Sequence, residues 1–123
     1  GNAALPSQYA AIEAMNRHDK PPSSTLEDLM IKQAIVTRTL SDIPRLKYNI
    51  PGGAFYVFLD LRKLTQNSAQ WCEALLMQKG VALVPGEAFS APGFARLTFS
   101  GDKDILQSGL SSIKSFVIGA SKS

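Results

Sequence analysis

Residues 50–61 have the sequence Ile-Pro-Gly-Gly-Ala-Phe-Tyr-Val-Phe-Leu-Asp-Leu, and the chain changes its hydrophobic period here. The Pro51-Gly52-Gly53 triplet predicts a turn, because proline presets one backbone angle and glycine allows conformations that other residues avoid. The six residues that follow, 54–59, are dense in aromatic and β-branched side chains, which predicts a strand. On both sides of this stretch the apolar spacing is helical, so the chain must combine helices with a sheet.

Two helices are expected before this strand. The apolar spacing predicts a short one over residues 6–15, followed by a rigid connector over residues 19–24, whose two prolines prevent helix. A longer helix begins after Ser24, which forms a capping box with Glu27, and ends before Pro44. Its expected apolar positions follow helical spacing: Leu26, Leu29, Met30, Ala34, Ile35 and Leu40.

After the central strand, helix and strand signals alternate. Asn67-Ser68 begins a helix that Gly80 ends as a left-handed cap. Residues 81–84 are expected to form a short buried strand, and residues 95–100 a third strand. A last helix begins near Gly101, and its apolar stripe consists of Leu106, Leu110, Ile113 and Val117.

These elements predict an α+β fold with a small, mainly antiparallel three-stranded sheet and helices packed chiefly on one face. We expect residues 1–20 to form a helical lead-in segment and residues 21–123 to form the domain. Between the second and third strands, the prolines and glycines of residues 85–93 predict a loop with a defined path.

The alternation along the strands predicts what each sheet face carries. Ala95, Leu97 and Phe99 point one way, together with Phe55, Val57 and Leu59, and these six should pack on the helices. The opposite face should carry Tyr56, Phe58, Arg96 and Thr98. Such a face is too apolar for plain solvent, so we expect another surface to cover it.

The composition excludes several classes of protein. The chain has 123 residues, 45% of them hydrophobic and only 19% charged, which fits one folded domain and excludes intrinsic disorder. One cysteine and one histidine cannot build a disulfide framework or a zinc site, so we expect no metal. The net charge of +3 comes from scattered basic residues, which argues against nucleic-acid binding. We expect no membrane segment and a cytoplasmic location.

Several residues of types that often carry chemistry are given structural roles here. The Ser111-x-x-Lys114 string matches a catalytic motif, but it lies within an amphipathic helix, where Lys114 should face water. His18 is expected at the surface. Trp71 and Cys72 are expected to pack in the core.

Three segments in order resemble one family. They are residues 51–56 (Pro-Gly-Gly-Ala-Phe-Tyr), residues 80–89 (Gly-Val-Ala-Leu-Val-Pro-Gly-Glu-Ala-Phe) and residues 93–100 (Gly-Phe-Ala-Arg-Leu-Thr-Phe-Ser). Together they resemble the C-terminal small domain of fold-type I aminotransferases, the aspartate aminotransferase-like class I/II group that uses pyridoxal phosphate. The resemblance covers nearly the whole chain and is strongest over residues 51–116.

The resemblance implies roles for individual residues. Arg96 matches the arginine that grips the substrate α-carboxylate, and a guanidinium can meet a carboxylate with two parallel hydrogen bonds. Tyr56, Glu87 and Phe89 are candidate cleft-lining residues, although a solvated carboxylate and a packed aromatic are the simpler interpretations of Glu87 and Tyr56. Ser90 stands where many members of the family have glycine.

The resemblance also implies what lies elsewhere. In the family, the lysine that holds pyridoxal phosphate lies in a large domain upstream, so we expect no catalytic lysine and no bound cofactor in this chain. The complete protein would be a homodimeric enzyme that moves an amino group between an amino acid and a 2-oxo acid. The chain alone would be inactive. The alternative is a stand-alone α+β binding module that uses its exposed sheet face for a small carboxylate or a protein partner.

Overall fold

The structure is a computed structural model that describes residues 25–52, 54–99 and 101–122. The expected helix over residues 6–15, the connector 19–24, the Ser24 cap, His18 and the lead-in segment 1–20 therefore lie outside the described residues. The elements, in chain order, are α2 (Thr25–Ser41), β1 (Lys47–Asn49), β2 (Tyr56–Asp60), α3 (Ser68–Lys79), β3 (Val84–Pro85), the 3-10 helix η2 (Gly86–Phe89), β4 (Phe94–Thr98) and α4 (Lys103–Lys122).

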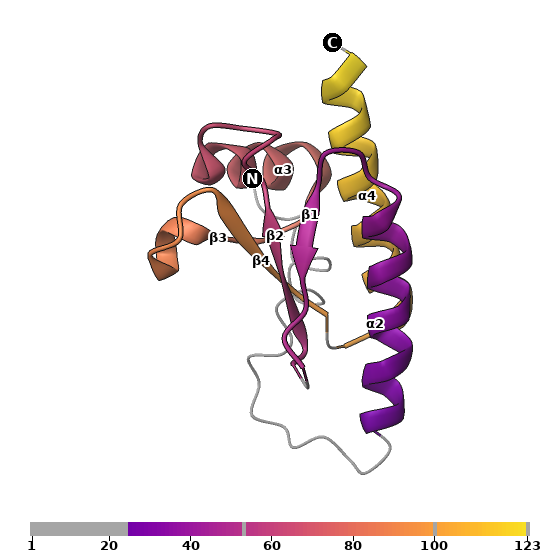
Figure 1. Ribbon diagram of the computed structural model, residues 1–123. Coiled ribbons are helices and arrows are strands. Elements are labelled where there is room, and N and C mark those ends of the chain that lie inside the picture. The colour runs from indigo at the N-terminus through magenta and orange to yellow at the C-terminus, as the bar shows by residue number, and fades with distance from the viewer. Residues whose placement is uncertain (1–24, 53, 100, 123) are drawn as a thin grey trace.

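The described strands form one antiparallel sheet with the order β1-β2-β4-β3. In Figure 1, α2 and α4 run side by side along the sheet, and α3 lies across its upper end. The expected α+β fold is confirmed, but the expectation of three strands is wrong, because the described residues form four. The additional strand, β1, is a three-residue edge strand that pairs only with β2.

The strand expected over residues 81–84 is shorter than predicted. Val81, Ala82 and Leu83 are buried, but only Val84 and Pro85 pair with β4. Burial of an apolar run does not require ladder hydrogen bonds, so these three residues fill the core as an irregular segment.

The core lies between the sheet and the helices. On the sheet side it contains Val57, Leu59, Ala95 and Leu97, all with no exposed surface, which confirms the expected strand faces. Phe99 is also fully buried, and Phe55 packs against the core from its edge. The expected stripe of α4 is buried at every position: Leu106, Leu110, Ile113 and Val117.

The orientation of α2 differs from the expectation. Leu29 and Leu40 are buried and Ile35 packs against the core, but Leu26, Met30 and Ala34 are exposed. The buried face runs through Leu29, Lys32, Val36 and Leu40, because this row faces the core beside α4. Apolar residues occupy more than one side of α2, so spacing alone could not choose the packed side.

The ends of α3 match their sequence signals. The side chain of Asn67 accepts a hydrogen bond from the N–H of Gln70, which satisfies one free donor of the first turn. At the other end, Gly80 has φ 73° and donates its N–H to the carbonyl of Leu76. This left-handed conformation is the reason that glycine ends the helix.

Candidate carboxylate-binding site

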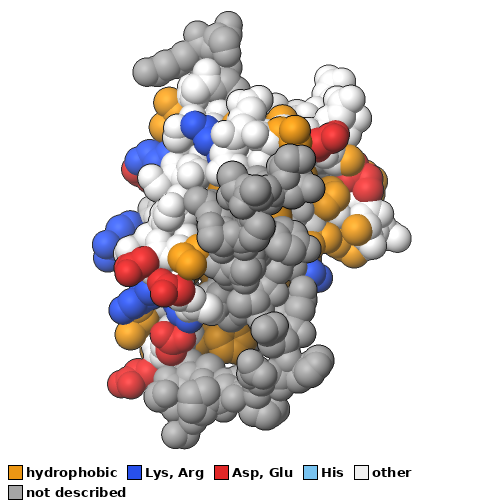
Figure 2. Space-filling view, turned by 180° about the vertical axis from the view of Figure 1, so that it is seen from behind, with side chains coloured by type: hydrophobic (Ala, Val, Ile, Leu, Met, Phe, Trp, Pro, Cys, Tyr) orange, Lys and Arg blue, Asp and Glu red, His pale blue; other side chains and the backbone are white. Residues whose placement is uncertain are grey.

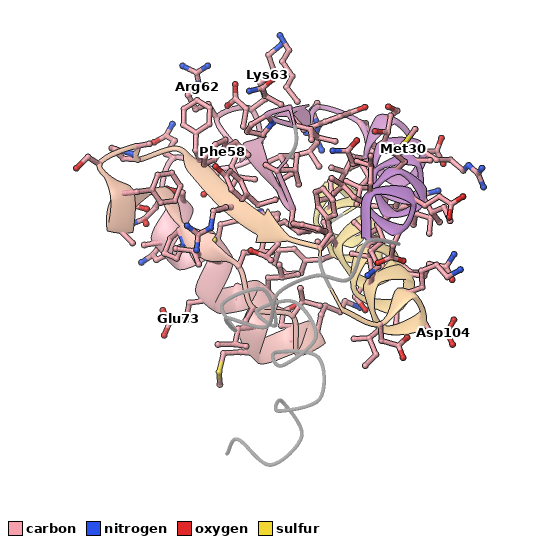
Figure 3. All side chains as sticks on the ribbon, turned by 90° about the horizontal axis from the view of Figure 1, so that it is seen from below. Met30, Phe58, Arg62, Lys63, Glu73 and Asp104 are labelled. Carbon is pink, nitrogen blue, oxygen red and sulfur yellow. The ribbon has the colours of Figure 1, made fainter. Side chains whose placement is uncertain are left out.

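The sheet face opposite the helices carries the candidate site. The register pairs Tyr56 with Thr98, Phe58 with Arg96, and Asp60 with Phe94, so all six residues share this outer face. Thr98 is nevertheless buried, whereas the other five are partly exposed. Figure 3 shows Phe58 on the sheet, away from Met30 on α2.

Arg96 lies in the middle of β4, between Phe58 of β2 and Val84 of β3. Its Nε atom is buried and has no hydrogen-bond partner. Its Cζ atom lies 5.9 Å from the centre of the Tyr56 ring, within the range of a cation–π contact. Among the described residues, no carboxylate forms an ion pair with Arg96.

A second arginine on this side has the partner that Arg96 lacks. Arg62 donates from Nε to Oδ1 of Asp60 at 2.9 Å and from Nη2 to Oδ2 at 2.8 Å, a two-bond fork. The hydrogen bonds from Arg62 lower the pKa of Asp60 below its usual value, and Asp60 in turn raises the pKa of Arg62. The Arg62 charge is thus balanced inside the domain.

An aromatic groove of about 440 Å³ lies beside these residues. Its apolar wall is formed by Tyr48, Phe58, Phe89 and Phe94, and its polar wall includes Lys47 and Asp60. The ring centres of Phe58 and Phe89 are 5.6 Å apart, and those of Phe58 and Tyr56 are 5.3 Å apart. In Figure 2, hydrophobic side chains gather at the β3–η2 edge, on the right, whereas charged side chains are interspersed over the α2 and α4 side.

Of the three predicted cleft-lining residues, Tyr56 lies against the Arg96 guanidinium. Phe89 packs against Phe58, which is the register partner of Arg96. Glu87 lies elsewhere, against the N-terminus of α3. Its carboxylate accepts hydrogen bonds from Ser68 Oγ at 2.8 and 2.9 Å and from the N–H of Ala69 at 3.3 Å.

The Glu87 contacts hold the loop of residues 85–93 to α3. Ser68 Oγ, which donates to Glu87, also accepts from the N–H of Gly93 at 2.8 Å, so both ends of the loop meet at this hydroxyl. The hydrogen bond from Ser68, with smaller contributions from the backbone N–H groups of Glu87 and Ala69, lowers the pKa of Glu87 below its ordinary value of 4.5. Glu87 thus stays ionised and acts as a structural acceptor.

The backbone of this loop is tightly closed. A Cβ atom at Gly86 would lie 1.8 Å from the carbonyl oxygen of Ala91, a distance that no side chain can occupy. Ser90 adopts the left-handed conformation, with φ 63° and ψ 32°. Ser90 is thus a non-glycine residue in a conformation that favours glycine.

The other residues that the sequence analysis considered have contacts that fit structural roles. Lys114 is partly exposed and pairs with Asp42 at 2.5 Å. Trp71 is buried and packs edge-on against Phe116 at 5.2 Å, and burial, with a smaller contribution from Glu87, raises the pKa of the neighbouring Cys72 thiol to about 12. A thiol with this pKa stays protonated, and Cys72 is packed in the core, as expected.

The Asp60–Arg62 pair and Phe94 were missed in the sequence. Alternation along the strand continues from Phe58 to Asp60, and this pattern could have placed Asp60 on the outer face. The described residues contain no group of three or more histidine, cysteine or acidic side chains that could hold a metal ion. They also contain no helix long and apolar enough to cross a membrane.

The geometry defines a small α+β domain that is covered by helices on one sheet face. On the other face it presents an arginine that has no acidic partner among the described residues. The family profile described as "Aminotransferase class I and II" matches residues 2–113. The chain therefore belongs to this family.

Individual relatives agree with this assignment. The chain is 36% identical over 110 residues to an aspartate aminotransferase of Thermotoga maritima and 31% identical over 115 residues to one of Bacillus subtilis; each match covers 89% of this chain. The same matches cover only 27% and 29% of the two relatives. The chain thus spans less than a third of their length.

Solved structures show the same domain. The crystal structure of the Thermotoga maritima aspartate aminotransferase superposes with a TM-score of 0.71 and 35% identity, over 78% of this chain and 24% of that one. An aminotransferase from Mycobacterium tuberculosis gives a TM-score of 0.67 and 32% identity, over 76% and 25% of the two chains.

Proposed function

We propose that this chain is the small domain of a pyridoxal-phosphate-dependent aminotransferase, in which Arg96 binds the substrate α-carboxylate. The reaction moves an amino group between an amino acid and a 2-oxo acid. The rest of the enzyme, including its large domain, and a second copy in a homodimer would complete the active site.

The contrast between the two arginines on the outer side carries this proposal. Arg62 forms its two-bond fork with Asp60, whereas Arg96 is partly buried and lacks an acidic partner among the described residues. A cation that is partly removed from water and not neutralised by the protein is stabilised when an anion binds. An amino acid and a 2-oxo acid share one anionic group, the α-carboxylate, so one arginine can hold both.

We expect the lysine that holds the cofactor to lie in the large domain and not in this chain. Lys32 pairs with Asp28, and Lys114 pairs with Asp42. Lys47 lines the aromatic groove beside Asp60, but that carboxylate is already bonded to Arg62. The family implies pyridoxal phosphate for the full-length enzyme, where it supplies the electron sink for the transfer. We assign this chain only the binding and orientation of the carboxylate, and we expect the chain alone to be inactive.

Replacement of Arg96 by lysine tests the proposal in the complete aminotransferase. Lysine keeps the charge but cannot form the planar fork, so one charge-assisted hydrogen bond is lost. We expect kcat/KM for the amino acid and for the 2-oxo acid to fall by on the order of a hundredfold. Steady-state kinetics of both half-reactions provide the measurement.

Arg62→Lys is the matched control, because it makes the same change in an arginine that already has an acidic partner. We expect its kcat/KM to stay close to that of the parent. If Arg96→Lys also stays within a few-fold of the parent, Arg96 does not bind the α-carboxylate.

A further inference from the structure

Among the described residues, Arg96 contacts an aromatic ring and has no acidic partner. Its register partner on β2 is Phe58, but its Cζ atom lies over the ring of Tyr56, two residues earlier on the same strand. The side chain therefore crosses the sheet diagonally, toward the end of the outer face where β2 begins. Diagonal neighbours in a sheet are within reach of long and aromatic side chains.

The Tyr56 ring is itself fixed in place. Its centre lies 5.3 Å from that of Phe58 at an interplanar angle of 72°, an edge-to-face contact. Phe58 in turn packs against Phe89 of η2 at 5.6 Å. The ring that faces the guanidinium is thus the end of a packed row of three aromatic side chains.

The burial of the Arg96 Nε atom limits how a ligand can approach. Since this atom is shielded from solvent and has no acceptor, a carboxylate can reach the guanidinium only at its two outer nitrogens. The direction in which these nitrogens point depends on the face of the Tyr56 ring, because no acid among the described residues holds them.

We infer that Tyr56 is a positioning residue that sets the orientation of the Arg96 guanidinium through its ring, and that its hydroxyl is dispensable for this role. The inference rests on the proposed function of Arg96. It goes beyond that function because it assigns a contribution to carboxylate affinity to the ring of Tyr56, which packs against Phe58.

The test compares Tyr56→Leu with Tyr56→Phe in the complete aminotransferase. Without the ring, the guanidinium is no longer held in one orientation. We therefore expect Tyr56→Leu to lower kcat/KM by roughly three- to tenfold, mainly through a higher KM. Tyr56→Phe keeps the ring and should stay within about twofold of the parent. Phe116→Leu, which removes a ring that packs edge-on against Trp71 on the helical side of the sheet, is the matched control and should leave kcat/KM unchanged.

A double-mutant cycle separates this inference from the proposed function. If the ring acts through Arg96, Tyr56→Leu should cause no further loss in an Arg96→Lys background. An undiminished kcat/KM in Arg96→Lys alone would overturn the proposed function. Two outcomes would overturn only the role of the ring. In the first, Arg96→Lys has a large effect and the effect of Tyr56→Leu is fully additive to it. In the second, Tyr56→Phe and Tyr56→Leu lower kcat/KM equally.

Discussion

At the scale of single residues, charge balance distinguishes Arg96 from Arg62, the other arginine on this side of the sheet. Arg62 and Asp60 neutralise each other, and Glu87 is engaged by Ser68. Arg96 instead lies against an aromatic ring, and its own Nε atom is buried without a hydrogen-bond partner. Arg96 thus has no acidic partner among the described residues, which agrees with the role proposed for it.

The backbone at Ser90 supports a prediction at this scale. A side chain in the left-handed region is strained, because Cβ crowds the carbonyl oxygen, whereas glycine has no such contact. We expect Ser90→Gly to stabilise the domain by about 0.5–1 kcal/mol, after allowing for the greater flexibility of glycine in the unfolded chain. Urea unfolding of the two proteins gives the difference in free energy.

Ser111→Gly is the control for this prediction. Ser111 is exposed within α4, where glycine is a poorer helix former than serine, so this substitution should destabilise the domain by about 0.5 kcal/mol. A destabilising effect of Ser90→Gly as well would show that serine is not strained at position 90.

At the scale of elements, the link between α3 and the loop of residues 85–93 depends on pH. The pKa of Glu87 is lowered in the folded state, chiefly by the hydrogen bond from Ser68, so its ionised form is bound more strongly there than in the unfolded chain. The stabilisation is therefore fully present above about pH 4.5 and is lost as the pH falls through the lower folded-state pKa.

Glu87→Gln tests this link. The amide carries no charge at any pH, so the variant should be less stable than the parent at pH 7, and the difference should shrink toward pH 3. Urea midpoints of both proteins between pH 7 and pH 3 measure it. Because Asp42 and Asp60 also have lowered pKa values and titrate in both proteins, only the difference between the two curves reports Glu87. A difference that is constant with pH would contradict the prediction.

At the scale of the whole molecule, the outer face of the sheet presents an apolar groove that the described α-helices leave partly exposed. Phe58, Phe89 and Phe94 line one groove there and remain partly exposed. Water contact with such a surface is unfavourable, and a larger enzyme could bury it. This chain spans less than a third of the length of its relatives, so the rest of such a protein is large enough to bury this face.

We accordingly expect the isolated chain to associate with itself at high concentration. Sedimentation velocity should show a mass that rises with concentration, and Phe89→Ser should weaken this rise because it removes one wall of the groove. Met30→Ser is the matched control, since Met30 is 62% exposed on α2, on another side of the molecule. A monomer at all concentrations, or an equal effect of the two variants, would contradict self-association through the groove.

The predicted and observed structures differ in instructive places. The missed strand β1 lies in the sequence Arg45-Leu46-Lys47-Tyr48-Asn49-Ile50, which alternates polar and apolar residues, but a three-residue strand is stable only because β2 is there to pair with it. Similarly, no local signal could show that Glu87 meets Ser68, because nineteen positions separate them along the chain.

Local chemistry was sufficient for the boundaries of α3, the stripe of α4 and the strand faces at Val57, Leu59, Ala95 and Leu97, because caps and periodicity act over a few neighbouring residues. Packing between distant segments decided the rest. It chose which side of α2 is buried, placed Glu87 against α3, and left Arg96 over the ring of Tyr56 with no acidic partner in the described part of the chain. These outcomes depend on contacts between segments that are far apart in the sequence, and such contacts form only when the chain folds.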